Sequence, residues 1–143
     1  MRLEILIDKL KKHFAFLGNY GFDYYSYDLF NKDSKEYISI ELKYSKLIIN
    51  NSLDFMIRFK PRIDQYSIYI YIYNEKERRS LSINDLLKLE KKISDDFINK
   101  INIDEELARW AEIVEHLFKT KLPKFLIGEE WISLPYHDPR DDY

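Results

Sequence analysis

The chain has no cysteine, only three glycines and only four prolines among its 143 residues. Each of these shortages excludes a kind of binding site or a kind of structure. Without cysteine it has neither a disulfide framework nor a thiolate metal site, which fits a reducing cytoplasm. The scattered Gly18, Gly21 and Gly128 cannot form a phosphate-binding loop. So few turn formers leave little room for long loops, and we expect a single domain over residues 1–143.

Long apolar runs and a strong net charge are also missing. No run of about 18 apolar residues occurs, so the sequence predicts no membrane-spanning helix. Charged residues such as Glu4, Asp8 and Lys9 interrupt the first segment, which therefore does not resemble a signal peptide. The net charge of −2 creates no field that would attract nucleic acid or a membrane surface. These features predict a cytoplasmic protein for which nucleic acid is a disfavoured partner.

Motifs for catalysis and metal binding are absent as well. The three histidines, His13, His116 and His137, form no His-x-x-x-His or His-Glu-x-x-His pair. No Gly-x-Ser-x-Gly nucleophile motif occurs, and the spacing of the many carboxylates selects no catalytic pair. The sequence therefore predicts a protein that is not an enzyme and that holds no metal ion or cofactor.

Aromatic residues are abundant instead, and the most informative stretch is the alternating segment 66–73. Side chains alternate across a strand, so Ile68, Ile70 and Ile72 share one face. Tyr69 and Tyr71 lie on the opposite face with Tyr73. The isoleucine face suits a dry core, whereas the tyrosine face carries apolar rings with polar tips.

Helical periodicity appears at both ends of the chain. Apolar residues at helical spacing predict a helix over residues 2–17, which Gly18 and Asn19 end. Ser82 followed by Asp85 resembles a capping box and predicts a second helix, whose apolar side extends to Ile93 and Phe97. A third helix is expected to begin at Asp104, with an apolar stripe that runs to residue 118.

Strand patterns fill the region between these helices. The alternation predicts strands over 22–30, 37–44, 55–60 and 66–73, with a short strand at 47–49 and polar turns at 31–34, 50–52 and 74–79. Short gaps favour antiparallel pairing of successive strands. The predicted fold is therefore α+β: a four- to five-stranded antiparallel meander with an N-terminal helix and two C-terminal helices packed on one face. We expect Ile38, Ile40 and Ile57 to join the isoleucine face against helices that include Leu6, Leu10, Trp110 and Val114.

The opposite face of this sheet is the first candidate binding surface. It combines Tyr69, Tyr71 and Tyr73 with Arg58 and Lys60, and tyrosine and arginine are enriched at binding hot spots. Two alternatives stay open for this face. The C-terminal segment around Trp131, Leu134 and Tyr136 would cover it, or it would stack RNA bases with Arg58, Lys60 and Arg62 on the phosphates. Protein docking is favoured over RNA because no positive field accompanies the tyrosines.

The acidic C-terminal segment, residues 126–143, is the second candidate surface. It carries five acidic side chains against the single basic side chain of Arg140, and these acidic residues are Glu129, Glu130, Asp138, Asp141 and Asp142. Such a segment suits a basic protein partner, and the alternative is a tail that is simply solvated.

The layout as a whole carries a family resemblance. An N-terminal helix leads to Tyr20-Gly21-Phe22 and a strand meander; Ser82-x-x-Asp85-Leu86-Leu87 opens a helix, and Leu126-Ile127-Gly128-x-x-Trp131 lies near the end. This order resembles small bacterial α+β immunity proteins of polymorphic or contact-dependent toxin systems. The resemblance implies a cytoplasmic, non-catalytic protein that binds and blocks a cognate toxin. The alternative functions are an adaptor or oligomeric regulatory module, or an RNA-binding sheet domain.

Overall fold

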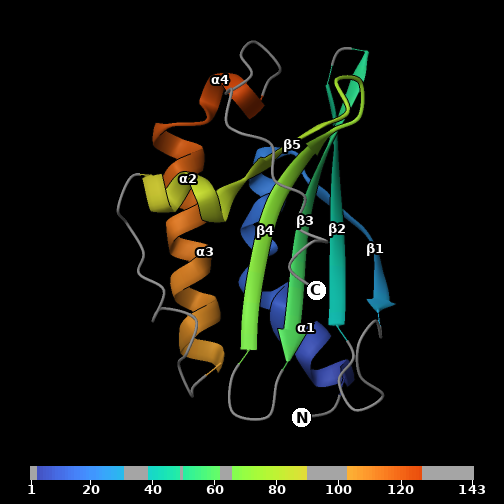
Figure 1. The fold of residues 1–143 in the computed structure, drawn as a ribbon, viewed down its shortest axis with the longest axis vertical. Coiled ribbons are helices and arrows are strands. Elements are labelled where there is room, and N and C mark those ends of the chain that lie inside the picture. The colour runs from blue at the N-terminus through green and yellow to red at the C-terminus, as the bar shows by residue number, and fades with distance from the viewer. Residues whose placement is uncertain (1–2, 31–38, 49, 62–65, 90–102, 127–143) are drawn as a thin grey trace.

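The computed structural model describes residues 3–30, 39–48, 50–61, 66–89 and 103–126. Figure 1 shows one sheet with helices on one of its sides. The elements in order are α1 (Leu3–His13), the 3-10 helix η1 (Ala15–Tyr20), β1 (Asp23–Phe30), β2 (Ser39–Ile48), β3 (Asn51–Pro61), β4 (Tyr66–Asn74), β5 (Arg79–Ser82), α2 (Ile83–Leu89), α3 (Ile103–Thr120) and α4 (Pro123–Leu126). The predicted α+β class is confirmed.

The sheet is a five-stranded meander in the order β1-β2-β3-β4-β5, and every neighbouring pair is antiparallel. Its central strand, β3, sets the register on both sides. Ile57 lies opposite Leu42 of β2 and opposite Ile70 of β4. Because paired residues point to the same face, these side chains form one continuous apolar row across three strands.

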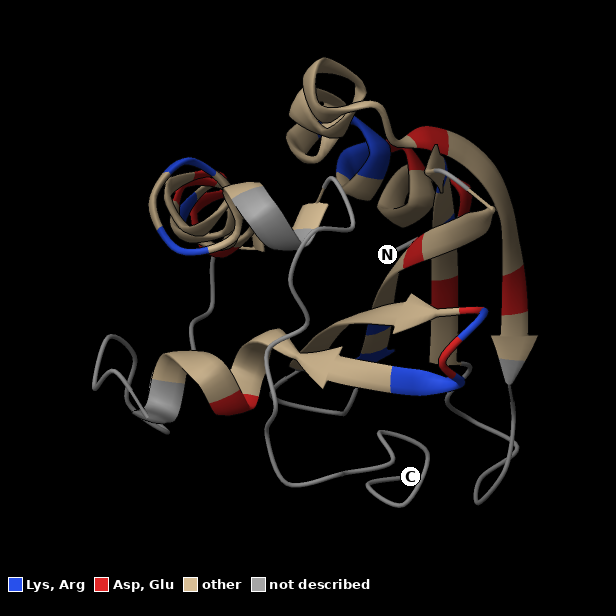
Figure 2. Ribbon diagram, turned by 90° about the horizontal axis from the view of Figure 1, so that it is seen from above, with Lys and Arg blue, Asp and Glu red and all other residues tan. Residues whose placement is uncertain are grey.

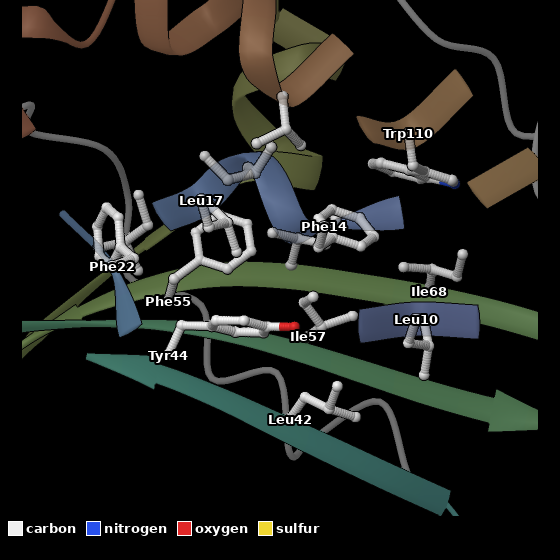
Figure 3. Packing of buried hydrophobic residues seen from close by; sticks show 14 of the residues in the cluster. Leu10, Phe14, Leu17, Phe22, Leu42, Tyr44, Phe55, Ile57, Ile68 and Trp110 are labelled. Carbon is white, nitrogen blue, oxygen red and sulfur yellow. The ribbon is translucent and has the colours of Figure 1, made fainter. Parts of the chain in front are cut away.

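The core lies between this apolar face and the helices. Leu10, Trp110 and Ile70 are completely buried in a single hydrophobic cluster. Figure 3 shows Leu10 and Trp110 on the helix side, facing Ile57 and Ile68 of the sheet. The isoleucine face and the packing of the helices on it are therefore confirmed for the described residues, and Ile38 lies outside them.

The N-terminal helix differs from its predicted bounds. The α-helix ends at His13, and the chain continues as η1 to Tyr20. Gly21 closes this segment with a φ of 86°, and its N–H donates to the Gly18 carbonyl. This left-handed conformation favours glycine, so the helical segment ends at Gly21 and not at the predicted Gly18.

The strand region also differs at its turns. Residues 47 and 48 of the predicted short strand are the end of β2, and residue 49 lies outside the described residues. β3 already begins at Asn51, after Asn50 with a φ of 56°. Sequence reasoning missed β5, because its first residue, Arg79, was assigned to the charged turn predicted over 74–79 and only three residues of the strand follow that turn. Arg78 reverses the chain within that turn with a φ of 53°. Both turns use left-handed residues, which tight hairpins require.

The predicted N-terminal cap is present at α2 and absent at α3. The Asp85 N–H donates to Ser82 Oγ, so the predicted cap of α2 is confirmed. Ile93 and Phe97, which were assigned to the same helix, lie outside the described residues. Asp104 is in the first turn of α3 rather than before it, and it binds Lys9 and His13 of α1.

One polar atom on the core face stands out. Tyr44 pairs with Phe55 in register and is almost fully buried. Its hydroxyl has no hydrogen-bond partner among the described residues, and burial raises the pKa of this phenol well above its usual range. A buried hydroxyl without a partner loses its hydration and gains little in return.

We expect Ile70→Ala to lower the free energy of unfolding by roughly 2–4 kcal/mol, because Ile70 is 0% exposed and its removal leaves a cavity. Denaturant unfolding followed by circular dichroism measures the change. The matched control is Leu47→Ala, which removes an 84% exposed side chain and should change stability by less than about 0.5 kcal/mol. Similar losses for both variants would contradict the assigned faces.

Tyr44→Phe should leave stability unchanged or raise the free energy of unfolding by about 1 kcal/mol, because it removes the buried hydroxyl and keeps the ring. Tyr44→Ala should instead lower it by about 3–5 kcal/mol through the lost ring. The two variants are compared in the same denaturant titration. A clear loss of stability in Tyr44→Phe would show that the hydroxyl is hydrogen-bonded.

Candidate protein-binding face

The outer face of the sheet is the side opposite the helices, and the strand register arranges its side chains in three rows. The first row runs Glu41, Arg58, Tyr69; the second runs Lys43, Met56, Tyr71, Ser82; the third runs Ser45, Asp54, Tyr73, Ser80. Each row crosses β2, β3 and β4. The antiparallel pairing therefore collects charged and tyrosine side chains that are far apart in the sequence.

An ion pair lies at the centre of this face. Arg58 Nε donates to Glu41 Oε2 at 2.8 Å, and a terminal guanidinium nitrogen contacts the same oxygen. Tyr71 Oη also donates to Glu41 Oε2, at 2.9 Å. Arg58 and Glu41 are only 3% and 7% exposed. Charge-assisted hydrogen bonds of this kind are stronger than neutral ones, and a buried charge requires them.

The tyrosines of β4 extend this network toward α2. The rings of Tyr69 and Tyr71 meet edge to face, with their centroids 6.5 Å apart. Ser82 Oγ donates to Tyr69 Oη at 3.1 Å and also accepts the N–H of Asp85 at the start of α2. The phenol groups of Tyr71 and Tyr69 are thus held in fixed positions by side chains from β2 and β5, respectively.

A second polar cluster surrounds Asp54, which is buried. Asp54 Oδ1 accepts from Ser45 Oγ at 2.9 Å, and Lys43 Nζ lies 3.6 Å from Oδ2. Glu75, in the turn after β4, hydrogen-bonds to Asp54, and this bond raises the pKa of the Glu75 carboxyl, with smaller contributions from burial and from the Asp54 charge.

The structure places the residues predicted for the tyrosine face on one side of the sheet, but Arg58 differs from its predicted role. Tyr69, Tyr71 and Tyr73 are half-buried on the outer face, and so is Lys60. Arg58 was expected to offer its charge to a partner; it is instead buried and paired with Glu41. The acidic residues Glu129, Glu130, Asp138, Asp141 and Asp142 lie outside the described part of the chain.

Sequence reasoning missed the more exposed aromatic surface, which is on β1. Tyr25 is 69% exposed, Tyr27 is 46% exposed and Leu29 is 45% exposed, and Tyr24 is exposed as well. Lys43 Nζ lies 5.0 Å from the centre of the Tyr25 ring. A signal was present, because the first strand of a meander has a neighbour on one side only, so tyrosines there are less covered than those on a central strand.

The described residues contain no group of three or more side chains that would hold a metal ion. No helix in the described part of the chain is both long and apolar enough to cross a membrane. Comparisons with known proteins give no relative: no protein-family model, curated protein or solved structure matches the chain.

The buried ion pair predicts a large difference between two glutamate substitutions. Glu41→Gln should lower the free energy of unfolding by about 3–5 kcal/mol, because it leaves the Arg58 charge buried without its counter-ion. The matched control is Glu105→Gln, whose partner Arg109 lies 2.8 Å away on the surface of α3. That exposed pair should contribute less than about 1 kcal/mol.

Thermal and denaturant unfolding of both variants measure this difference. A double variant that replaces Glu41 and Arg58 with leucine and methionine should recover part of the loss, because it removes both charges together. Equal and small effects for Glu41→Gln and Glu105→Gln would show that Arg58 is open to solvent and available to a partner.

Proposed function

We propose that the chain is a non-catalytic protein-binding module and, within that class, an immunity protein that binds and neutralises a cognate bacterial toxin in the cytoplasm. The observation that carries the binding role is the set of exposed aromatic side chains on β1, Tyr24, Tyr25 and Tyr27 with Leu29, at the edge of a well-packed sheet. Exposed tyrosines on a rigid scaffold supply large contact area with little loss of side-chain entropy. The toxin role rests on the resemblance in layout to immunity proteins, which is an analogy.

The outer face supports binding in a second way. Tyr69 and Tyr71 are held by hydrogen bonds to Ser82 and Glu41, so a partner that contacts them does not need to order them first. Pre-organised side chains reduce the entropic cost of association. The acidic residues 129–142 would add attraction for a basic partner such as a nuclease domain.

An RNA-binding role is the weaker alternative. Base-stacking sheets need free cations next to their aromatic rings to hold phosphates. The Arg58 guanidinium lies 6.0 Å from the centre of the Tyr71 ring, and Glu41 already neutralises its charge. The net charge of the chain is −2, which supplies no compensating field.

The immunity proposal expects the gene directly upstream to encode a large secreted protein with a toxic C-terminal domain, and the test is co-expression of the chain with that domain. We expect the chain to form a complex with that domain and to restore the growth of cells that it poisons. Tyr73→Ala should increase the dissociation rate at all salt concentrations, because tyrosine contacts are short-range. Truncation after Leu134 removes three acidic residues, so it should slow association, mainly at low salt.

Circular dichroism first establishes that each variant is folded, and surface plasmon resonance gives the rates. A complex without restored growth would favour the adaptor or regulatory alternative. Neither binding nor protection, or no such upstream gene, would contradict the immunity role. Normal binding by both variants would exclude contacts of Tyr73 and of residues 135–143 with the partner.

A further inference from the structure

β1 is an edge strand of the described sheet. Among the residues that the structure describes it pairs with β2 alone, and over the five residues Ser26–Phe30 this pairing is regular, because the irregularity in register lies between Tyr24 and Ser26. Every second residue of such a strand directs its backbone N–H and C=O groups away from its single neighbour. The other edge strand, β5, has four residues and leads directly into α2. The edge at β1 therefore offers the larger set of pairing groups.

The side chains of this edge differ between the two faces of the sheet. Tyr27 and Leu29 point to the helix side, opposite Leu42 and Ile40, which are completely buried. They continue the apolar core row to the margin, where they remain 46% and 45% exposed. An added strand with apolar side chains on the helix side would cover both residues and extend the core.

The outer face of the same edge is acidic. Asp28 is exposed and lies opposite Glu41, whose charge is paired with Arg58. Figure 2 shows β1 along the margin of the sheet, with acidic positions and no basic ones. Like charges directly opposite on adjacent strands are unfavourable, and opposite charges are favourable. A strand that pairs with β1 is therefore most stable with a basic residue next to Asp28.

The same charge disfavours a second copy of this chain as the occupant. Antiparallel self-pairing that aligns all five residues of Ser26–Phe30 places Asp28 directly opposite Asp28 of the other copy, and a shift of two residues, which separates the two carboxylates, pairs only three of the five residues. A shift of one residue would place the outer-face side chains of one copy opposite the helix-side side chains of the other, which the buried core of each sheet does not allow. The exposed aromatic side chains of β1 would by themselves suit a dimer. The repulsion between two Asp28 carboxylates instead favours a partner strand with a basic residue at this position.

We infer that β1 binds an extended segment of a partner protein as an additional strand. This segment carries lysine or arginine opposite Asp28 and apolar side chains opposite Tyr27 and Leu29. The inference rests on the proposed protein-binding function and adds the mode of recognition and the chemistry of the partner. Backbone pairing along a sheet edge supplies affinity in such complexes, and the alternating side chains supply specificity.

The first experiment uses synthetic peptides of about nine residues, the length of a long strand, with blocked termini. One peptide alternates valine and lysine, a second alternates valine and glutamate, and a third is the lysine peptide with N-methylated central amides. Amide NMR spectra of the whole chain report where each peptide binds. We expect the lysine peptide to shift the Ser26–Phe30 amides and to bind about tenfold more tightly than the other two.

The second experiment reverses the charge. Asp28→Lys should make the glutamate peptide the tighter ligand, by about tenfold. The matched control is Asp23→Lys, which makes the same change at an exposed residue of β1 that lies before the irregularity in register. This control should keep the preference for lysine. Equal effects of the two substitutions would overturn the inference, since net charge alone would then explain the binding.

Further results would overturn the inference that β1 binds an added strand. No shift of the Ser26–Phe30 amides at millimolar lysine peptide, or a dimer in sedimentation that Asp28→Lys abolishes or strengthens, would overturn the inference. The complex with the upstream toxin domain separates this inference from the proposed function. If that complex forms and Asp28→Lys leaves it unchanged, the β1 mode is wrong and the function stands. If no complex forms while the lysine peptide binds β1 as expected, the toxin-binding function fails and the edge site stands.

Discussion

The register of β3 against its two neighbours is the constraint on which the rest of the structure depends. Ile57 lies between Leu42 and Ile70 on the helix side, and the next residue, Arg58, lies between Glu41 and Tyr69 on the outer side. One pairing therefore creates both the apolar core row and the buried ion pair. A slip of one residue would send the isoleucines to the outer face and the charges to the core, so each face enforces the register of the other.

The two faces contribute differently to the molecule. Burial of apolar side chains on the helix side supplies most of the stabilisation, at roughly 25 cal/mol per Å² of apolar surface. The Glu41–Arg58 pair contributes less net energy, because both charges lose their hydration, but it penalises any arrangement that separates them. It also fixes Tyr71 in place through the hydrogen bond to Glu41. The centre of the outer face is thus held by its own hydrogen bonds, whereas β1, at the edge of the described sheet, carries exposed rings.

This division explains why the two tyrosine-rich strands differ in character. Tyr69 and Tyr71 lie on β4, which has a strand on each side, and their hydroxyl groups bind Ser82 and Glu41. Tyr25 and Tyr27 lie on β1, which has one neighbour among the described strands, and both are exposed. Tyrosines on β4 therefore form hydrogen bonds within the protein, whereas tyrosines on β1 expose surface that a partner could contact. The difference comes from position in the sheet and not from composition.

The sequence by itself determined the α+β class, the antiparallel meander, the apolar faces of the helices and the face on which each isoleucine of 66–73 lies. These features follow from periodicity, which acts within each segment. Only the tertiary structure decided that Arg58 is neutralised by Glu41, because the two residues are 17 positions apart and meet through strand register. It also decided how far each tyrosine is exposed, because the meander order marks the first strand as an edge but does not give the packing around its side chains. Pairing between segments is a property of the assembled sheet, and no local pattern encodes it.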